Sequence, residues 1–227
     1  MKERFIANWV AFLGRMPSLV LGLFLFAAGL VANLYSGLGM SPWGVLTIGI
    51  EQHMPLTLGQ TSQMIGLVVL AIGWALGFAP GFGTIANMIF IGTFIDLIIV
   101  WGLLRTPTSL IDQYVMLLFS IVLIGVASYL YLRVRLGAGP RDGLMIGLVT
   151  MLDRPVSTIR GVIELTVLII EYLLGGPVGI GTVLTALLLG ASVQIAFRIG
   201  RYDRKTPHIN LLELYRYLTG EGNLNLV

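Results

Sequence analysis

The chain has 227 residues, of which 56% are hydrophobic and 11% are charged, and its formal net charge is +3. A soluble domain usually carries about 25% charged residues, so this composition argues against a soluble enzyme, a secreted module or a disordered chain. The sequence contains no cysteine, which excludes disulfides, thiolate zinc sites and cysteine nucleophiles. Composition therefore predicts a polytopic membrane protein, with the lipid bilayer as its surroundings.

Six apolar stretches are long enough to cross a bilayer as helices, which takes about 20 residues. In chain order they cover residues 17–36, 60–78, 84–104, 113–134, 157–175 and 181–199. Two shorter apolar pieces, 41–53 and 140–152, have the length of re-entrant or interfacial helices, and the sequence leaves that choice open. The predicted fold class is all-α, a polytopic membrane helix bundle.

The positions of Lys and Arg predict the orientation, because cytoplasmic loops accumulate basic residues. With six spans and a cytoplasmic N-terminus, 13 of the 14 Lys and Arg residues fall inside and only Arg105 falls outside. Eight spans would give a poorer division of 11 to 3. The C-terminus is then cytoplasmic as well. The basic residues lie at membrane edges and form no continuous face, so nucleic acid is not an expected partner.

An internal repeat keeps one register through most of the chain. An offset of 98 residues pairs identical residues without a gap: Gly39 with Gly137, Pro42 with Pro140, Gly49 with Gly147, Gly81 with Gly179, and Thr84 with Thr182. Each half holds three crossings, an odd number, so the second half enters the membrane from the opposite side. Such inverted 3+3 repeats are typical of secondary transporters with a midplane site. Four crossings per half would instead make the repeats parallel, and duplication alone can also serve bundle stability.

This repeat divides the chain into four parts. An interfacial N-terminal segment covers residues 1–16, the first repeat half 17–112, the second repeat half 113–200, and a cytoplasmic tail 201–227.

The two short pieces begin alike, with a small residue before a proline. Serine or glycine followed by proline is typical of a helix start, and a helix N-terminus favours a carboxylate or another anion. The predicted substrate-binding residues are Ser41, Pro42, Trp43, Asn87, Gly139 and Arg141. Alternatively, both pieces are interfacial helices that only pack, and Asn87 only joins helices.

Ionisable residues within membrane segments are costly, which makes them candidate functional residues. Asp96 in the third span, Glu164 in the fifth and Asp142 in the second short piece are predicted proton-coupling groups. Arg160 precedes Glu164 by four residues and is expected to form an ion pair with it. A structural alternative is that this pair is only neutralising and that Asp96 is hydrogen-bonded between helices. No catalytic residue, metal site or cofactor is predicted.

The runs GLGMSPWGVLTIGI and GFGTIANMIFIGTFIDLI, with their echoes in the second half, resemble the YczE/YyaS/YitT family of bacterial integral membrane proteins. The resemblance covers roughly residues 17–200. It implies a multi-pass protein of the bacterial plasma membrane, for which transport is a common supposition. Relatives commonly have an acidic residue after the Trp or Arg of the proline motif; Asp142 keeps it, whereas Gly44 replaces it in the first half.

These patterns predict a secondary transporter of a small solute, with an amino acid and an organic anion as the two substrate classes considered. The alternative is a non-transporting membrane protein that stabilises or regulates another complex, and a channel also remains open. No motif of an intramembrane enzyme is present. The sequence does not decide the substrate, the coupling ion, the direction of transport, or whether the chain joins a homo-oligomer or another membrane partner.

Overall fold

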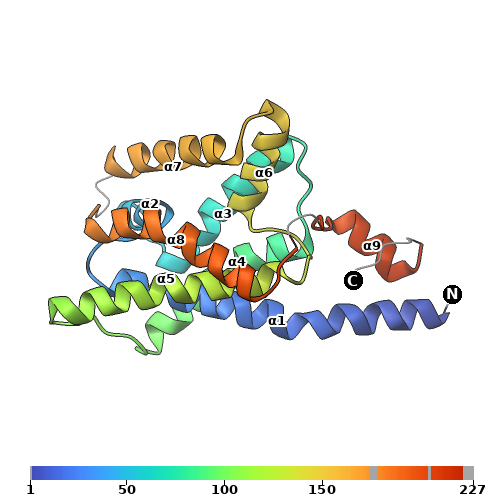
Figure 1. Ribbon diagram of the computed structural model, residues 1–227, viewed down its shortest axis with the longest axis horizontal. Helices are drawn as coiled ribbons and strands as arrows, with labels where there is room; N and C mark the ends of the chain where they lie inside the picture. The colour runs from blue at the N-terminus through green and yellow to red at the C-terminus, as the bar shows by residue number, and fades with distance from the viewer. Residues whose placement is uncertain (1, 174–177, 204–205, 222–227) are drawn as a thin grey trace.

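The computed structural model describes residues 2–173, 178–203 and 206–221. Within these ranges the regular secondary structure is entirely α-helical, which confirms the predicted all-α class (Figure 1). The helices in chain order are α1 (Lys2–Tyr35), α2 (Pro42–Glu51), α3 (Leu58–Ala75), α4 (Phe82–Val100), α5 (Leu110–Leu132), α6 (Pro140–Leu152), α7 (Val156–Leu173), α8 (Ile180–Ile199) and α9 (Leu211–Thr219).

Five helices, α1, α3, α4, α5 and α8, are long and apolar enough to cross a membrane. The expected span over 157–175 corresponds to α7, whose apolar stretch covers only Gly161–Ile170. The short helices α2 and α6 measure about 15 and 20 Å, so neither crosses a hydrocarbon core of about 30 Å. Both occur where the two short apolar pieces were predicted.

The first helix differs from its prediction, because α1 continues through Pro17 instead of beginning there. A proline within a helix removes one backbone hydrogen bond. Contacts on both sides of the proline hold α1 against α5 and the loop that follows it. Arg15 Nη1 donates to the carbonyl of Val134 in that loop at 3.0 Å, and Ser18 Oγ donates to the Leu130 carbonyl of α5 at 2.9 Å. Residues 2–16 therefore form the first half of α1 and not a separate segment.

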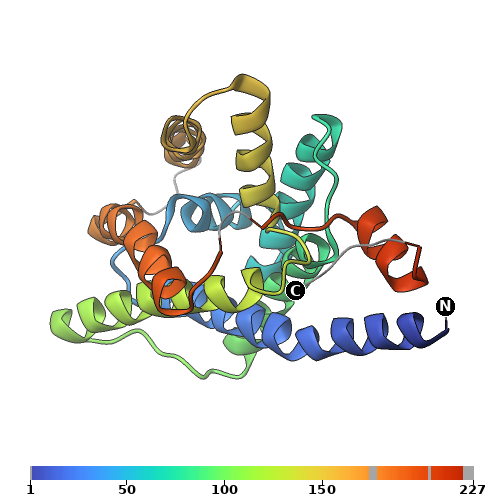
Figure 2. The same cartoon turned by 45° about the vertical axis from the view of Figure 1, so that its right-hand side comes forward.

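The helices α1 and α5 form an antiparallel pair along the molecule (Figures 1 and 2). Arg15 near the start of the pair contacts Val134, whereas Asn33 near the end of α1 donates to Ser120 Oγ at 2.9 Å. A Cβ atom at Gly29 would lie 2.6 Å from the side chain of Ile124, so the two helices approach closely there. The largest buried apolar cluster is built mainly on α1 and α4, and Tyr131 is the buried residue that α5 contributes to it.

The two halves of the chain exchange equivalent backbone contacts. The Gly83 amide at the start of α4 donates to the Leu136 carbonyl at 2.6 Å, and the Gly181 amide at the start of α8 donates to the Leu38 carbonyl at 2.7 Å. The offset of 98 residues converts one contact into the other. Helix packing is equivalent in the same way. The offset of 98 residues relates α2 to α6 and α3 to α7, and α6 packs on α3 just as α2 packs on α7.

Glycine is required where these contacts form. Gly39 and Gly137 have positive φ angles of 105° and 122°, which side chains with a Cβ rarely adopt. A Cβ at Gly39 would lie 2.8 Å from Thr182 Oγ1, and one at Gly137 would lie 2.7 Å from Thr84 Oγ1. The repeated glycines of the sequence thus correspond to points where one half touches the other.

The C-terminal segment joins one end of the bundle. Asn8 Nδ2 donates to the Tyr217 carbonyl at 2.6 Å, which ties α9 to the first half of α1. The amide of Leu211 donates to the Pro80 carbonyl at 3.0 Å, and the amide of Ile209 donates to the Arg135 carbonyl at 3.0 Å. The loops before α4 and before α6 therefore lie at the same end as the C-terminal segment.

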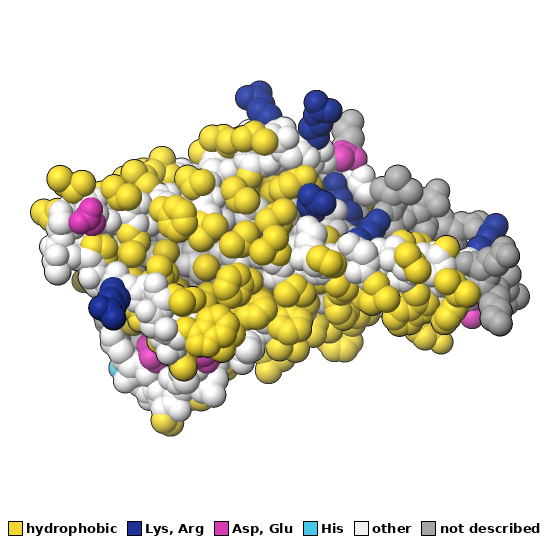
Figure 3. Space-filling model, turned by 90° about the horizontal axis from the view of Figure 1, so that it is seen from below, with side chains coloured by type: hydrophobic (Ala, Val, Ile, Leu, Met, Phe, Trp, Pro, Cys, Tyr) yellow, Lys and Arg dark blue, Asp and Glu magenta, His cyan; other side chains and the backbone are white. Residues whose placement is uncertain are grey.

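The surface carries the character expected of a membrane protein. Figure 3 shows hydrophobic side chains over most of one face, while most of the Lys and Arg side chains lie toward one end. Exposed apolar side chains occur on every helix long enough to cross a membrane, as Val20, Leu67, Ile89, Val122 and Leu187 illustrate. An exposed apolar surface of this extent is stable in lipid and unfavourable in water.

Candidate functional site

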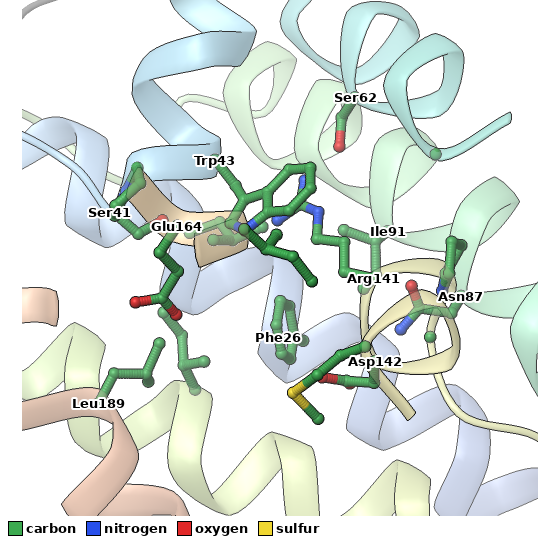
Figure 4. A pocket seen from close by; sticks show the side chains of 18 of the residues that line it. Phe26, Ser41, Trp43, Ser62, Asn87, Ile91, Arg141, Asp142, Glu164 and Leu189 are labelled. Atoms are coloured by element: carbon green, nitrogen blue, oxygen red, sulfur yellow. The ribbon is translucent and has the colours of Figure 1, made fainter. Parts of the chain in front are cut away.

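The main candidate site is a cavity of about 170 Å³ at the centre of the bundle (Figure 4). Its lining includes residues from each of the helices α1 to α8 or from the cap before them. This volume accommodates roughly 11 to 17 water molecules, since one needs about 10–15 Å³. Most of the wall is apolar, and its larger apolar members are Phe26, Leu30, Met88, Ile91, Ile124, Met145, Ile163 and Leu189.

The cavity brings together most of the residues singled out in the sequence. Those lining it are Ser41, Pro42, Trp43, Asn87, Gly139, Arg141, Asp142 and Glu164. They come from four different helices, α2, α4, α6 and α7, and their caps, far apart in the chain. Asp96 is not among the lining residues, and the side chain of Arg160 lies outside the described part of the chain, as does its expected ion pair with Glu164. The functional roles of all these residues stay predictions.

Both short helices start at the cavity. Ser41 is the N-cap of α2 and Gly139 the N-cap of α6, and in each case a proline opens the helix as predicted. Neither N-cap residue caps its helix by a hydrogen bond from its own side chain. The partially positive amide groups of two helix starts are therefore concentrated at one place, which favours negative charge there.

A polar side chain from the preceding long helix holds each of these caps. Asn33 Oδ1 of α1 accepts from the Ser41 amide at 3.3 Å, and the Tyr131 hydroxyl of α5 contacts the backbone of Gly139. Asn33 and Tyr131 are themselves related by the offset of 98 residues. Side chains at equivalent positions therefore hold the N-caps of α2 and α6, an amide group in the first half and a hydroxyl group in the second.

Arg141 and Trp43 meet at the middle of the cavity. The guanidinium carbon of Arg141 lies 4.5 Å from the centroid of the Trp43 ring, a cation–π contact between α6 and α2 (Figure 4). Among the described residues, the Arg141 side chain forms no hydrogen bond and no ion pair. Its five N–H donors are consequently free of protein acceptors within that part of the chain.

Two carboxylates line the cavity, and each has a partner. The Tyr131 hydroxyl donates to Asp142 Oδ2 at 2.9 Å, which holds Asp142 against α5. Glu164 projects from α7 and has an interaction of its own within the protein (Figure 4). The site therefore combines one guanidinium with two carboxyl groups, a set that can bind a charged solute and accept protons.

Asp96 has a different environment, at the contact of α4 with the start of α3. Its Oδ2 accepts from Thr57 Oγ1 at 2.5 Å, and its Oδ1 accepts from the Gly59 amide at 2.8 Å. Thr57 is the N-cap of α3. The Asp96 carboxylate thus supplements the capping of α3, which corresponds to the interhelical hydrogen bonding considered as the structural alternative.

Sequence reasoning missed four polar residues of the site. Ser62, Tyr131 and Thr185 line the cavity, and buried Asn33 donates to Thr185 Oγ1 at 3.2 Å. The repeat pointed to three of them, because the offset of 98 residues pairs Asn33 with Tyr131 and Asn87 with Thr185. These pairs are polar in both halves but not identical, so a comparison limited to identical residues overlooks them.

The described residues hold no group of three or more His, Cys, Asp or Glu side chains that could bind a metal ion. The ionisable groups of the cavity comprise a single arginine, two carboxyl groups and a tyrosine hydroxyl.

Comparison with known proteins identifies relatives that match most of the chain. Residues 13–198 match a family of unknown function, DUF6198. An uncharacterized protein of Haemophilus influenzae is 35% identical over 201 residues, which cover 88% of this chain and 90% of the relative. The uncharacterized membrane protein YczE of Bacillus subtilis is 34% identical over 200 residues, covering 86% of this chain and 88% of YczE.

A third relative, the uncharacterized protein YyaS of Bacillus subtilis, is 23% identical over 193 residues, covering 77% of this chain and 88% of YyaS. These matches confirm the resemblance to YczE and YyaS seen in the sequence. No solved structure matches the chain.

Proposed function

The chain belongs to DUF6198, a family of unknown function, and on the geometry of its central cavity we propose that it is a secondary transporter of a small solute, an amino acid or an organic anion. One observation carries the proposal: the starts of the two short helices, one from each half, meet at a cavity lined by all of α1 to α8. Transporters with repeated halves place their substrate sites at such broken helices.

In this proposal six helices cross the membrane, with α7 as the sixth, and the halves form an inverted 3+3 repeat. The reciprocal hydrogen bonds Gly83–Leu136 and Gly181–Leu38 support a two-fold relationship between the halves. The antiparallel packing of α1 on α5 supports opposite orientations, because these helices occupy equivalent places in the two halves. The short helices α2 and α6 then enter from opposite sides as re-entrant segments.

The proposed location is the bacterial inner membrane, with both chain termini in the cytoplasm. The loop before α6, the C-terminal segment and the first half of α1 lie at one end of the bundle. Basic residues concentrate there, for example Arg15, Arg133, Arg135 and Arg201, whereas Arg105 lies in the loop beside Gly37 at the other end. The positive-inside rule assigns the basic end to the cytoplasm.

Coupling to protons is assigned to the carboxyl groups of the cavity. Glu164 and Asp142 line the space that the solute would occupy, so a change in their protonation would change its binding. Asp96 accepts hydrogen bonds at the start of α3 and does not line the cavity. A coupling role for Asp96 therefore has less support than one for Glu164 or Asp142.

Flux through reconstituted vesicles tests the proposal. Vesicles with an imposed pH gradient are offered a panel of labelled amino acids and organic acids, and saturable accumulation is expected for at least one of them. Glu164→Gln should abolish the dependence on the pH gradient, while Asp112→Asn, a matched change on the exposed first turn of α5, should leave it unchanged. Absence of flux for every solute, together with co-purification of a membrane partner, would favour the accessory protein; non-saturable flux would indicate a channel.

A further inference from the structure

We propose that the solute is an organic anion with a compact apolar body, and that its carboxylate or similar oxyanion binds the guanidinium of Arg141. This inference names the ligand of the cavity to which the proposed transport function is assigned. Binding and transport are separable measurements, so each of the two ideas can fail alone.

The first argument is the unsatisfied hydrogen-bonding capacity of Arg141. A guanidinium carries five N–H donors in a planar fork, and no described residue accepts from them. The contact with Trp43, at 4.5 Å from the guanidinium carbon to the ring centroid, is a cation–π contact and uses none of these donors in a hydrogen bond to a protein acceptor. A carboxylate or another planar oxyanion matches those edges with two parallel hydrogen bonds.

The second argument decides between an anion and an amino acid. A zwitterion would also need an acceptor for its ammonium group, and the cavity offers Asp142 and Glu164. Asp142 already accepts from Tyr131 at 2.9 Å, and Glu164 is engaged within the protein. Arg141 is thus the one charged group of the cavity without a hydrogen-bonded or ion-paired partner among the described residues, so its N–H donors are where an oxyanion of the solute would bind.

The third argument is the field around Arg141. The helices α2 and α6 both start at the cavity, and neither N-cap residue caps its helix with its own side chain. The 10 residues of α2 and the 13 residues of α6 are enough to give each start a partial positive charge. Both helix starts therefore add to the attraction that the Arg141 side chain exerts on an anion.

The fourth argument concerns the rest of the solute. Beyond Arg141 the wall is formed largely by aliphatic, aromatic and thioether side chains, such as Phe26, Ile91 and Leu189. An inorganic anion would leave these side chains in contact with water, whereas an apolar body would displace that water favourably. A cavity of about 170 Å³ fits a solute of roughly ten non-hydrogen atoms.

Equilibrium binding to the full chain in detergent tests the inference. Benzoate is the probe, because it joins a carboxylate to a compact apolar ring. Benzamide is its neutral isostere, benzylamine a cation with the same ring, and inorganic phosphate an anion without an apolar body. Affinity is measured with labelled benzoate, the other three compounds are tested as competitors, and thermal stability is recorded for each mixture.

We expect benzoate to bind at least tenfold more tightly than benzamide, benzylamine or phosphate. Arg141→Gln should abolish benzoate binding, and Arg141→Lys should weaken it at least tenfold because a lysine cannot form the bidentate contact. Arg133→Gln is the control, since the Arg133 guanidinium also lies over an aromatic ring, Tyr129, but is exposed outside the cavity. Its affinity should match that of the unaltered protein.

Several results would overturn the inference: no benzoate binding to the folded protein, equal competition by benzamide or phosphate, preference for benzylamine, or full affinity in folded Arg141→Gln. Circular dichroism and size-exclusion elution establish that each variant is folded. Arg141-dependent binding of benzoate without any flux in vesicles would support the inference and refute the transport proposal. Saturable flux of a cation that does not depend on Arg141 would support the transport proposal and refute the inference about the anion.

Discussion

Trp43 and Arg141 occupy equivalent positions in the two halves of the chain, 98 residues apart, and the guanidinium carbon of Arg141 lies 4.5 Å from the centroid of the Trp43 ring. When two halves are related by a two-fold axis, equivalent residues that touch each other must lie at that axis. The contact therefore marks the place where the halves meet, and the cavity lies around it. The two equivalent positions carry different side chains, an aromatic ring at Trp43 and a cation at Arg141, so the site has a single guanidinium.

Replacing Trp43 tests whether its ring positions Arg141. We expect Trp43→Leu to weaken benzoate binding about 2- to 30-fold, because a cation–π contact contributes about 0.5–2 kcal/mol. Trp43→Phe should recover part of the loss. Trp74→Leu is the control, since Trp74 is 64% exposed on α3 and does not line the cavity. Equal affinity in Trp43→Leu and Trp74→Leu would show that the ring has no influence on the guanidinium.

Thiol labelling tests the opposite orientation of the halves. The natural chain has no cysteine, so single cysteines can be introduced directly. Met54 lies just after α2, and Leu152 is the last residue of α6, so the offset of 98 residues relates the two positions. Their side chains are 44% and 50% exposed, respectively. In intact cells a membrane-impermeant maleimide should label Met54→Cys at once, and Leu152→Cys only after the membrane is made permeable. Labelling of both positions from one side would make the repeat parallel.

The sequence predicted the fold well wherever length and apolar character decide the structure. Five of the expected crossings and both short helices occur as helices near the predicted residues. The error lies at Pro17, where the local preference of proline for a helix start was overruled by packing of α1 on α5 and α9. Tertiary contacts of this kind have no signature within a window of neighbouring residues.

The site was predictable to the extent that the repeat revealed it. Ser41, Gly139 and Arg141 stand at the breaks of the repeated pattern, and all three line the cavity. Asp96 was singled out because a charge within a span is costly, a criterion that cannot separate a cavity wall from a helix cap. The partners that distinguish these roles, Thr57 for Asp96 and Tyr131 for Asp142, depend on how distant helices pack.

Asp96→Ala should lower the stability of the protein. The carboxylate accepts from Thr57 Oγ1 and from the Gly59 amide, and removing it leaves two donors without their acceptor. Hydrogen bonds to a charged group contribute about 1.5–3 kcal/mol, and partial exposure of Asp96 places the expected loss at the lower end. Thermal unfolding in detergent measures it.

Gln194→Ala is the matched control, because Gln194 is the repeat-equivalent residue on α8 and is exposed. It should leave the unfolding temperature unchanged. Asp96→Asn separates the two roles considered for this residue, since we expect it to lower stability while flux keeps its dependence on the pH gradient. Loss of that dependence at unchanged stability would instead make Asp96 a coupling group.

The docking of the C-terminal segment should weaken in acid because of His208. Burial, with a contribution from the nearby charge of Arg135, lowers the pKa of His208 from 6.5 to about 4. Arg135 Nη1 donates to Tyr202 Oη at 2.7 Å, and that oxygen lies 3.0 Å from His208 Nε2, so the docked imidazole is held neutral in this cluster. Its buried Nδ1 has no hydrogen-bond partner among the described residues.

The direction of the pH effect on docking follows from proton uptake by His208. Between pH 6.5 and 4 the histidine of the undocked segment binds a proton, whereas the docked histidine does not. The free energy that favours docking therefore decreases as the pH falls through this window, by at most about 3 kcal/mol. Limited proteolysis between residues 202 and 211 should accelerate over the same range. His208→Gln should remove the pH dependence, whereas His53→Gln, which alters the exposed loop after α2, should retain it. An identical pH profile in His208→Gln would show that another group controls docking.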